Sequence, residues 1–127
     1  MVTLPLRIRA PEPSDRGLVF SGWKESFSHS AWAHRFATSR EYFAIVNLVL
    51  DEVVPRCHLF IACLEEDPAT VVGWLATLAD KPEYLYVKPR WGADDGIRRL
   101  IEDKLCEYAG VRAPPPWDPI RALERVK

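Results

Sequence analysis

Residues 84–101, YLYVKPRWGADDGIRRLI, combine residue types that favour anion binding with residue types that oppose it. A strand pattern leads into a turn with Gly92 and Gly96, and the first turns of a helix follow. The first backbone N–H groups of a helix have no partner within the helix and carry partial positive charge, so an anion can bind there. Asp94 and Asp95 stand in the same turn, where their charge would repel an anion. The stretch therefore predicts either an anion-binding loop or a helix capped by its own aspartates.

The elements that position this loop can be read from hydrophobic spacing and from turn residues. We expect strands at 6–10, 57–64, 70–78 and 83–88, and helices that start near Asp15, at Ser39, at Asp95 and near Pro119. The turn EEDPA predicts that two of the strands form an antiparallel hairpin. Tyr84 and Tyr86 fall on one face of the next strand, with Leu85 and Val87 on the other, so both faces should be covered. The order predicts an α+β fold, a mainly antiparallel sheet with helices on both faces.

Length and charge narrow the class of protein. The 127 residues fit one domain, residues 1–127, and 48% of them are hydrophobic, which is enough for a real core. The 17 basic and 18 acidic side chains nearly cancel and form no long run, which argues against a nucleic-acid or membrane binder. No segment has the pattern of a signal peptide or a membrane span. The three cysteines form no CxxC pair, so we expect reduced thiols and a cytoplasmic protein.

With these residues and this element order, the chain resembles the GNAT superfamily of N-acetyltransferases. The likeness extends over about residues 6–110 and is strongest in residues 84–101, with GWL at 73–75 as a further point. Small divergent acetyltransferase-like proteins encoded by bacteriophages are similar in their FSGW helix and YVK strand. The resemblance implies a GNAT-like fold with a shortened C-terminus and an acetyl-CoA cofactor. If the chain is phage-encoded, it implies action in the host cytoplasm, on a host protein or a small amine.

The same resemblance implies which residues would contact acetyl-CoA or CoA. The cofactor-binding residues would be Val87, Lys88, Gly92, Ala93, Asp95, Gly96, Ile97 and Arg98. The family's Gly-rich pattern is not fully kept, because an alignment without gaps places Asp95 at a motif position. A slip of one residue brings Gly96 and Ile97 onto the expected pair. Arg90, Arg98 and Arg99 could offset the two aspartates if they reach the phosphates.

Acetyl transfer to an amine needs a general base and a general acid. Glu83, at the start of the signature strand, is the carboxylate candidate, although a surface glutamate at a turn is the more ordinary interpretation. In the family, a tyrosine after the signature helix often serves as the general acid. No tyrosine follows Tyr108 in this sequence, so that acid is missing. Tyr86 is the remaining candidate acid, against the alternative that Tyr84 and Tyr86 only pack.

The other reactive side chains favour structural roles. Alternation along a strand puts Cys57 and Cys63 on one face and His58 on the other, so the sequence predicts no metal site. His29 and His34 belong to the segment that lies near the acceptor in the family, although solvated loop histidines are the ordinary alternative. Only 17 residues follow Gly110, and an open sheet edge or apolar face could bind a second copy or a host protein. The second functional hypothesis is therefore a catalytically inactive GNAT-fold module that engages and inhibits a host enzyme.

Overall fold

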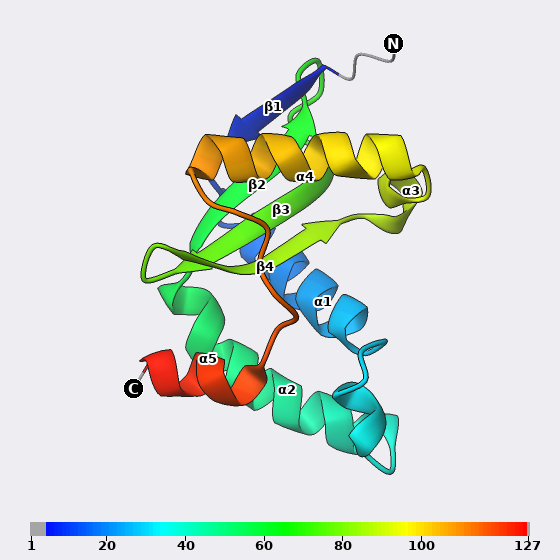
Figure 1. Ribbon diagram of the computed structural model, residues 1–127, viewed down its shortest axis with the longest axis vertical. Coiled ribbons are helices and arrows are strands. Elements are labelled where there is room, and N and C mark those ends of the chain that lie inside the picture. Colours follow the sequence, from blue (N-terminus) through cyan, green and yellow to red (C-terminus); the bar gives the residue numbers. More distant parts are fainter. Residues whose placement is uncertain (1–4, 127) are drawn as a thin grey trace.

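The computed structural model describes residues 5–126, which form four strands and five α-helices (Figure 1). In chain order the elements are β1 (Leu6–Arg9), α1 (Asp15–Phe27), α2 (Ser39–Val53), β2 (His58–Leu64), β3 (Val71–Leu78), β4 (Lys81–Val87), α3 (Pro89–Gly92), α4 (Asp95–Ala109) and α5 (Pro119–Val126). Short 3-10 turns at Ala33–Arg35 and Val54–Arg56 flank α2. No helix in this part of the chain is long and apolar enough to cross a membrane.

The four strands form one sheet in the order β1-β2-β3-β4, and each neighbouring pair is antiparallel. Helix α4 lies across one face of the sheet, α1 and α2 lie on the other side, and α5 packs against α2 (Figure 1). Every residue of β3 is buried because helices cover both faces of the sheet. The expected α+β class with helices on both faces is confirmed.

Aromatic side chains form the core between the sheet and α1. The ring of Trp23 lies 4.9 Å from that of Tyr84 and 5.6 Å from that of Trp74. Trp117, from the extended chain between α4 and α5, reaches the same cluster with its ring 4.9 Å from that of Trp23. The proline-rich segment is therefore fixed to the core by one large buried side chain.

On the opposite face, α4 approaches the sheet closely at Gly73. A Cβ atom at Gly73 would lie 2.5 Å from the carbonyl oxygen of Tyr86 and 3.3 Å from Cγ2 of Ile101. Glycine is needed here because the backbone of β4 leaves no room for a methyl group. Leu85 and Val87 pack against the α4 side and Tyr84 and Tyr86 against the α1 side, as alternation along the strand predicts.

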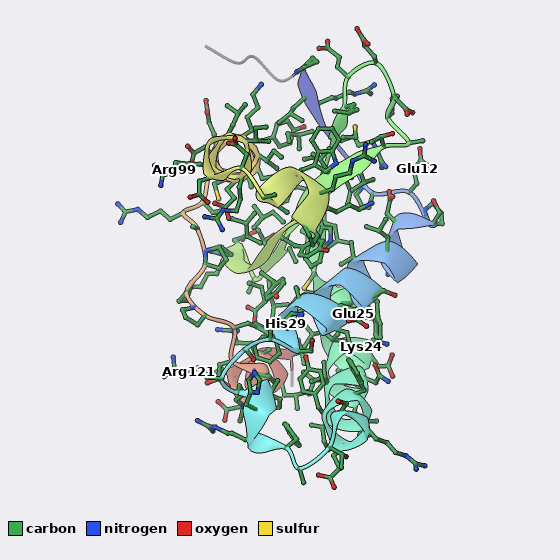
Figure 2. The ribbon with its side chains drawn as sticks, turned by 90° about the vertical axis from the view of Figure 1, so that its right-hand side faces the viewer. Glu12, Lys24, Glu25, His29, Arg99 and Arg121 are labelled. Carbon is green, nitrogen blue, oxygen red and sulfur yellow. The ribbon has the colours of Figure 1, made fainter. Side chains whose placement is uncertain are left out.

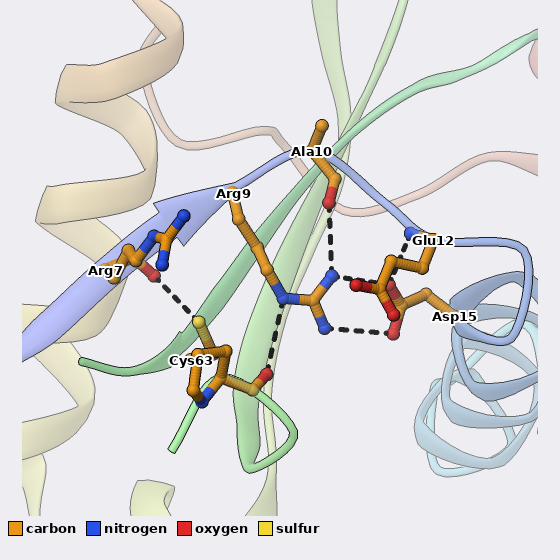
Figure 3. Close-up of polar contacts among 7 residues, drawn as sticks. Arg7, Arg9, Ala10, Glu12, Asp15 and Cys63 are labelled. Atoms are coloured by element: carbon orange, nitrogen blue, oxygen red, sulfur yellow. Dashed lines mark hydrogen bonds and ion pairs between the residues drawn. The ribbon is translucent and has the colours of Figure 1, made fainter. Parts of the chain in front are cut away.

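A buried ion pair fixes the start of α1 to the end of β1 (Figure 3). Nη1 of Arg9 lies 2.6 Å from Oδ2 of Asp15, and the two side chains are only 11% and 7% exposed. Arg9 also donates to the carbonyl oxygens of Ala10 and Pro68, and the Asp15 carboxylate accepts from the N–H of Glu12. These bonds satisfy both charges, as burial requires.

Strand ends differ from the expected bounds by one or two residues, as for β4, which begins at Lys81 and not at Glu83, and the helices differ at two places. The N-cap of α2 is Thr38, whose hydroxyl accepts from the N–H of Glu41, and not Ser39, which is the first helical residue. Residues 89–92 form the one-turn helix α3 where the sequence predicts only a turn. Pro89 favours the helix because its fixed φ suits the first helical position.

Candidate functional site on the edge of the sheet

The outer edge of β4 carries backbone groups without partners in the sheet. The N–H of Lys88 donates to the carbonyl of Val72, so these two residues form a hydrogen-bonded pair of the antiparallel ladder. Such pairs alternate with pairs that do not exchange hydrogen bonds, and Leu85 and Val87 belong to the second kind. Their N–H and C=O groups therefore point away from β3. This edge could pair with an extended ligand as an added strand.

Residues 111–118, which we call the C-terminal strap, run beside this edge without pairing with it. No backbone hydrogen bond within residues 5–126 joins the strap to β4. Pro114, Pro115 and Pro116 have no N–H to donate, which prevents regular strand pairing. A hollow of about 320 Å³ separates strap and strand, lined by Tyr84, Leu85, Glu102 and residues 113–117. The strap thus forms the far wall of a groove along β4.

The N-terminus of α4 lies beyond the end of β4. The N–H groups of Asp95 and Gly96 have no acceptor within residues 5–126, as expected for the first turn of a helix. Oδ1 of Asp94 accepts from the N–H of Ile97 at 3.0 Å, which makes Asp94 the N-cap. An incoming anion would find two free N–H donors and would compete with Asp94 for a third.

The charges around this helix end are mixed. Asp95 forms an exposed ion pair with Arg98 at 3.1 Å, the carboxylate side chain being 84% exposed. Lys88, Arg90 and Arg99 form no ion pair within residues 5–126, so basic groups outnumber the two aspartates. Figure 2 looks onto this face, with α4 seen nearly end-on beside Arg99. The loop can offer cations to a phosphate, although an isolated exposed charge contributes little.

The backbone conformation of the loop does not require glycine at positions 92 and 96. Neither has a positive φ, which among the described glycines is found only at Gly110, the C-cap of α4. A Cβ at Gly92 would meet no atom closer than 3.6 Å, and one at Gly96 would lie 3.2 Å from Oδ1 of Asp94. The two glycines instead leave the backbone uncovered, so a ligand can approach it closely.

Glu83 is buried. The ordinary interpretation of the sequence, which made it a surface glutamate at a turn, is therefore wrong. Glu83 is the extra residue of a bulge in β4, where the register with β3 shifts. Oε1 of Glu83 accepts from Nε1 of Trp117 at 2.9 Å and from Nη2 of Arg125 at 2.7 Å. The side chain is 2% exposed, so the carboxylate holds the strap and α5 and is poorly placed to take a proton from a substrate.

Tyr86 has a free hydroxyl group, in contrast to Tyr84. The hydroxyl of Tyr84 lies 2.6 Å from Oγ of Ser26, whereas no hydrogen bond within residues 5–126 involves the hydroxyl of Tyr86. Burial raises the pKa of Tyr86, and the charge of Glu25 raises it further. Tyr86 is therefore protonated at neutral pH and can act as a proton donor.

Glu25 is a candidate that the sequence analysis missed. It is an exposed carboxylate on α1, close enough to Tyr86 for its charge to raise the pKa of that hydroxyl. The available signal was helical spacing, since Glu25 follows Gly22 by three residues. A Cβ at Gly22 would lie 3.3 Å from Cε2 of Tyr86, so this face of α1 meets the tyrosine directly. Figure 2 shows Glu25 and His29 on the face that also carries the end of α4.

The remaining reactive side chains are separate from the groove. His29 and His34 are exposed and line a hollow of about 320 Å³ at the N-terminal end of α2. Burial raises the pKa of Cys57 to about 12, so its thiol stays protonated and unreactive. The described residues contain no group of three or more His, Cys, Asp or Glu that could hold a metal ion.

Solved structures share this fold. The chain matches the solution structure of apo YjaB from Escherichia coli with a TM-score of 0.56 and 20% identity, over 87% of this chain and 68% of that one. It matches a GCN5-related N-acetyltransferase from Rhodopseudomonas palustris with a TM-score of 0.56 and 19% identity, over 91% of this chain and 78% of that one. No family profile and no curated protein sequence matches the chain. The fold is therefore that of the GNAT acetyltransferases, as the sequence analysis expects.

Proposed function

We propose that the chain binds an acyl-coenzyme A such as acetyl-CoA and transfers the acetyl group to an amine of a small molecule or a protein. One observation carries the proposal: the free edge of β4 at Leu85 and Val87 leads directly to the uncapped N–H groups of Asp95 and Gly96. A strand edge suits an amide-bearing extended ligand, and a helix N-terminus suits a phosphate. CoA carries both parts in this order.

The residues present fit this cofactor, with one competitor. Leu85 and Val87 would pair with the pantetheine arm, and Lys88, Gly92, Ala93, Asp95, Gly96, Ile97 and Arg98 surround the place where the pyrophosphate would bind. The unfilled space at Gly92 supports close approach of a phosphate. The competitor is Asp94, whose carboxylate already satisfies the N–H of Ile97. Binding would displace this cap or leave it beside the phosphates at an electrostatic cost.

When bound, acetyl-CoA supplies an activated acetyl group as a thioester. Tyr86 would protonate the departing thiolate, because its hydroxyl is protonated and free. Glu25 would take the proton of the attacking amine, either directly or through water, because its carboxylate is exposed near Tyr86. Glu83 would act as the anchor of the strap.

Thermal unfolding with and without acetyl-CoA tests the proposal, with ATP and dephosphorylated CoA as controls. A ligand at 100 times its dissociation constant stabilises a protein by about 2.7 kcal/mol, which shifts the melting temperature by several degrees here. A shift with acetyl-CoA and none with ATP is expected. No shift at millimolar acetyl-CoA would contradict cofactor binding, and acetylation of a panel of amines then tests transfer.

A second candidate is a catalytically inactive module that engages and inhibits a host enzyme, as suits a phage-encoded protein. Two observations favour it: Asp94 already occupies the third free N–H of α4, and the buried carboxylate of Glu83 is held in an ion pair with Arg125. This candidate predicts no response to acetyl-CoA and a stable complex with one host protein after affinity capture and cross-linking.

A further inference from the structure

A second hollow lies where the C-terminal strap meets the start of β4 and the last helix, α5. It has a volume of about 210 Å³, and three prolines, Trp117 and four charged side chains line it. The volume is below the roughly 300 Å³ at which pockets for drug-sized ligands begin, so the hollow suits a ligand much smaller than CoA. Its lining includes neither Tyr86 nor Glu25, although strap residues 115–117 also form the wall of the groove along β4.

Glu83 gives this hollow an acceptor that has no donor. Its Oε1 accepts from Trp117 and Arg125, whereas no hydrogen bond within residues 5–126 reaches Oε2. Oε2 is not among the fully enclosed side-chain atoms that lack a partner, so it is open to the hollow that Glu83 lines. The side chain as a whole is only 2% exposed, and a carboxylate oxygen this far from bulk water is ordinarily hydrogen-bonded. An N–H group of a ligand would supply the missing bond.

Two guanidinium groups of α5 line the same hollow with unused donors. Arg121 and Arg125 are four residues apart, so both lie on one face of the helix. Arg125 donates only to Glu83, and the nearest carboxylate oxygen to Arg121 is Oδ2 of Asp118 at 4.0 Å, beyond hydrogen-bond distance. Figure 2 shows Arg121 at the surface of the molecule. Two neighbouring guanidinium groups with free N–H donors suit a carboxylate.

The remaining lining of the hollow is apolar, and its charges cancel. Pro82, Pro115, Pro116 and the indole ring of Trp117 offer surface for an apolar group. The two guanidinium groups are balanced by two carboxylates, of which Asp118 is occupied as the cap of α5, since its Oδ1 accepts from the N–H groups of residues 120 and 121. A ligand with one charge of either sign would meet a like charge, whereas a zwitterion meets an opposite charge at each end.

We infer that this hollow binds a free α-amino acid with an apolar side chain. The α-ammonium group donates to Oε2 of Glu83, the α-carboxylate accepts from Arg121 and Arg125, and the side chain packs against the prolines and Trp117. Each part of the ligand thus meets the group of the protein that lacks a partner or offers apolar surface. The inference requires neither coenzyme binding nor acetyl transfer, because the three charged contacts lie outside the groove along β4.

An NMR titration with leucine, in the absence of coenzyme, tests the inference. The indole N–H signal of Trp117 should move as the site fills, because this group donates to the same carboxylate, with a dissociation constant of about 10 μM to 1 mM for so small a ligand. Leucinamide lacks the carboxylate, 4-methylpentanoate lacks the ammonium group and glycine lacks the side chain, so each should bind at least about tenfold more weakly. No shift at about 10 mM leucine would mean that water alone satisfies Oε2, which would overturn the inference. Equal binding of leucine and leucinamide would also overturn it, in favour of a peptide N-terminus.

Arg121→Ala provides the sharpest variant. The side chain of Arg121 is 77% exposed and donates no hydrogen bond within the described part of the chain, so the melting temperature should not change while leucine binds about tenfold more weakly. Arg40→Ala removes an exposed arginine from α2 and is the matched control, with unchanged binding. Glu83→Gln should abolish the shift, because it removes the charge that meets the ammonium group. Wild-type affinity in Arg121→Ala would overturn the inference. Binding of acetyl-CoA is measured separately, so either proposal can fail alone.

Discussion

Oε1 of Glu83 lies 2.7 Å from Nη2 of Arg125, and this pair joins the bulge of β4 to the last helix of the chain. The same oxygen accepts a hydrogen bond from Trp117 at the end of the strap. One buried carboxylate therefore holds two elements that follow α4, which lack any backbone pairing with the sheet. These two interactions of Glu83 therefore hold the strap in position as the far wall of the groove beside β4.

Removal of the Glu83 carboxylate should destabilise the fold. Glu83→Ala leaves the indole N–H of Trp117 and the guanidinium of Arg125 without their acceptor, which we expect to cost about 2–3 kcal/mol. Arg125→Ala should cost less, since its side chain is 40% exposed. Glu83→Gln keeps an acceptor for Trp117 and should fall between them. Urea unfolding measures all three. A fully stable Glu83→Ala variant that loses only acetyl transfer would show that Glu83 is a catalytic base.

The Arg9–Asp15 pair should make stability depend on pH at the acid end. The hydrogen bond that Asp15 accepts from Arg9 lowers the pKa of its carboxyl group below the ordinary value. The stabilisation is fully present above the unfolded-state value near 3.8 and is lost as pH falls through the lower folded-state value. Asp15→Asn should therefore flatten the decline in unfolding free energy below about pH 4. Urea titrations of both proteins from pH 7 to the acid limit measure it, and equal acid slopes would contradict it.

Asp94 should oppose coenzyme binding while it stabilises α4. Asp94→Ser keeps a capping oxygen but removes the charge, so stability should hardly change and acetyl-CoA should bind several-fold more tightly. Asp94→Ala removes both and should cost about 1 kcal/mol. Calorimetric titration with acetyl-CoA at low and high salt separates the effect of the charge from the effect of the cap, because salt weakens only the electrostatic repulsion. Equal affinities for wild type and Asp94→Ser would place the phosphates away from this loop.

Tyr86 should matter for turnover and little for folding. Tyr86→Phe removes a hydroxyl without a partner, so the melting temperature should stay close to that of the wild type. If Tyr86 protonates the thiolate, kcat should fall about 100-fold while acetyl-CoA affinity is kept. Tyr84→Phe is the matched control: it loses the contact with Ser26 and should lower stability more than turnover. Because the pKa of Tyr86 is raised, ionisation of its hydroxyl should not reduce activity at any pH up to about 10.

Two glycines should respond to alanine in opposite directions. Gly73→Ala places a methyl group 2.5 Å from the carbonyl oxygen of Tyr86, so β4 or α4 must move. The free energy of unfolding should therefore fall by about 2 kcal/mol. Gly17→Ala meets no atom and should stabilise the fold by about 1 kcal/mol through helix propensity. Thermal unfolding of both variants measures this. A neutral Gly73→Ala would mean that the sheet adjusts readily under α4.

The sequence alone predicted the order of the main elements, and the physical reasons are local. Alternation along 84–87 assigned the two faces of β4 correctly, because side chains of a strand point to opposite faces. Gly110 is the C-cap of α4 in the left-handed conformation with φ of 70°, a position at which glycine is the usual residue. Capping by Asp94 or Asp95 was one of two interpretations of the loop, and the structure makes Asp94 the N-cap, because its carboxylate accepts from a free N–H of the first helical turn.

Tertiary structure decided what the local pattern could not show. Glu83 has the sequence context of a surface glutamate, and only the return of Trp117 and Arg125, 34 and 42 residues later, makes it buried. Glu25 comes near Tyr86 because α1 packs on β4 at Gly22, a contact between elements about 60 residues apart. Hydrophobic periodicity determines which face of an element is buried, whereas the partners of its polar groups depend on long-range packing.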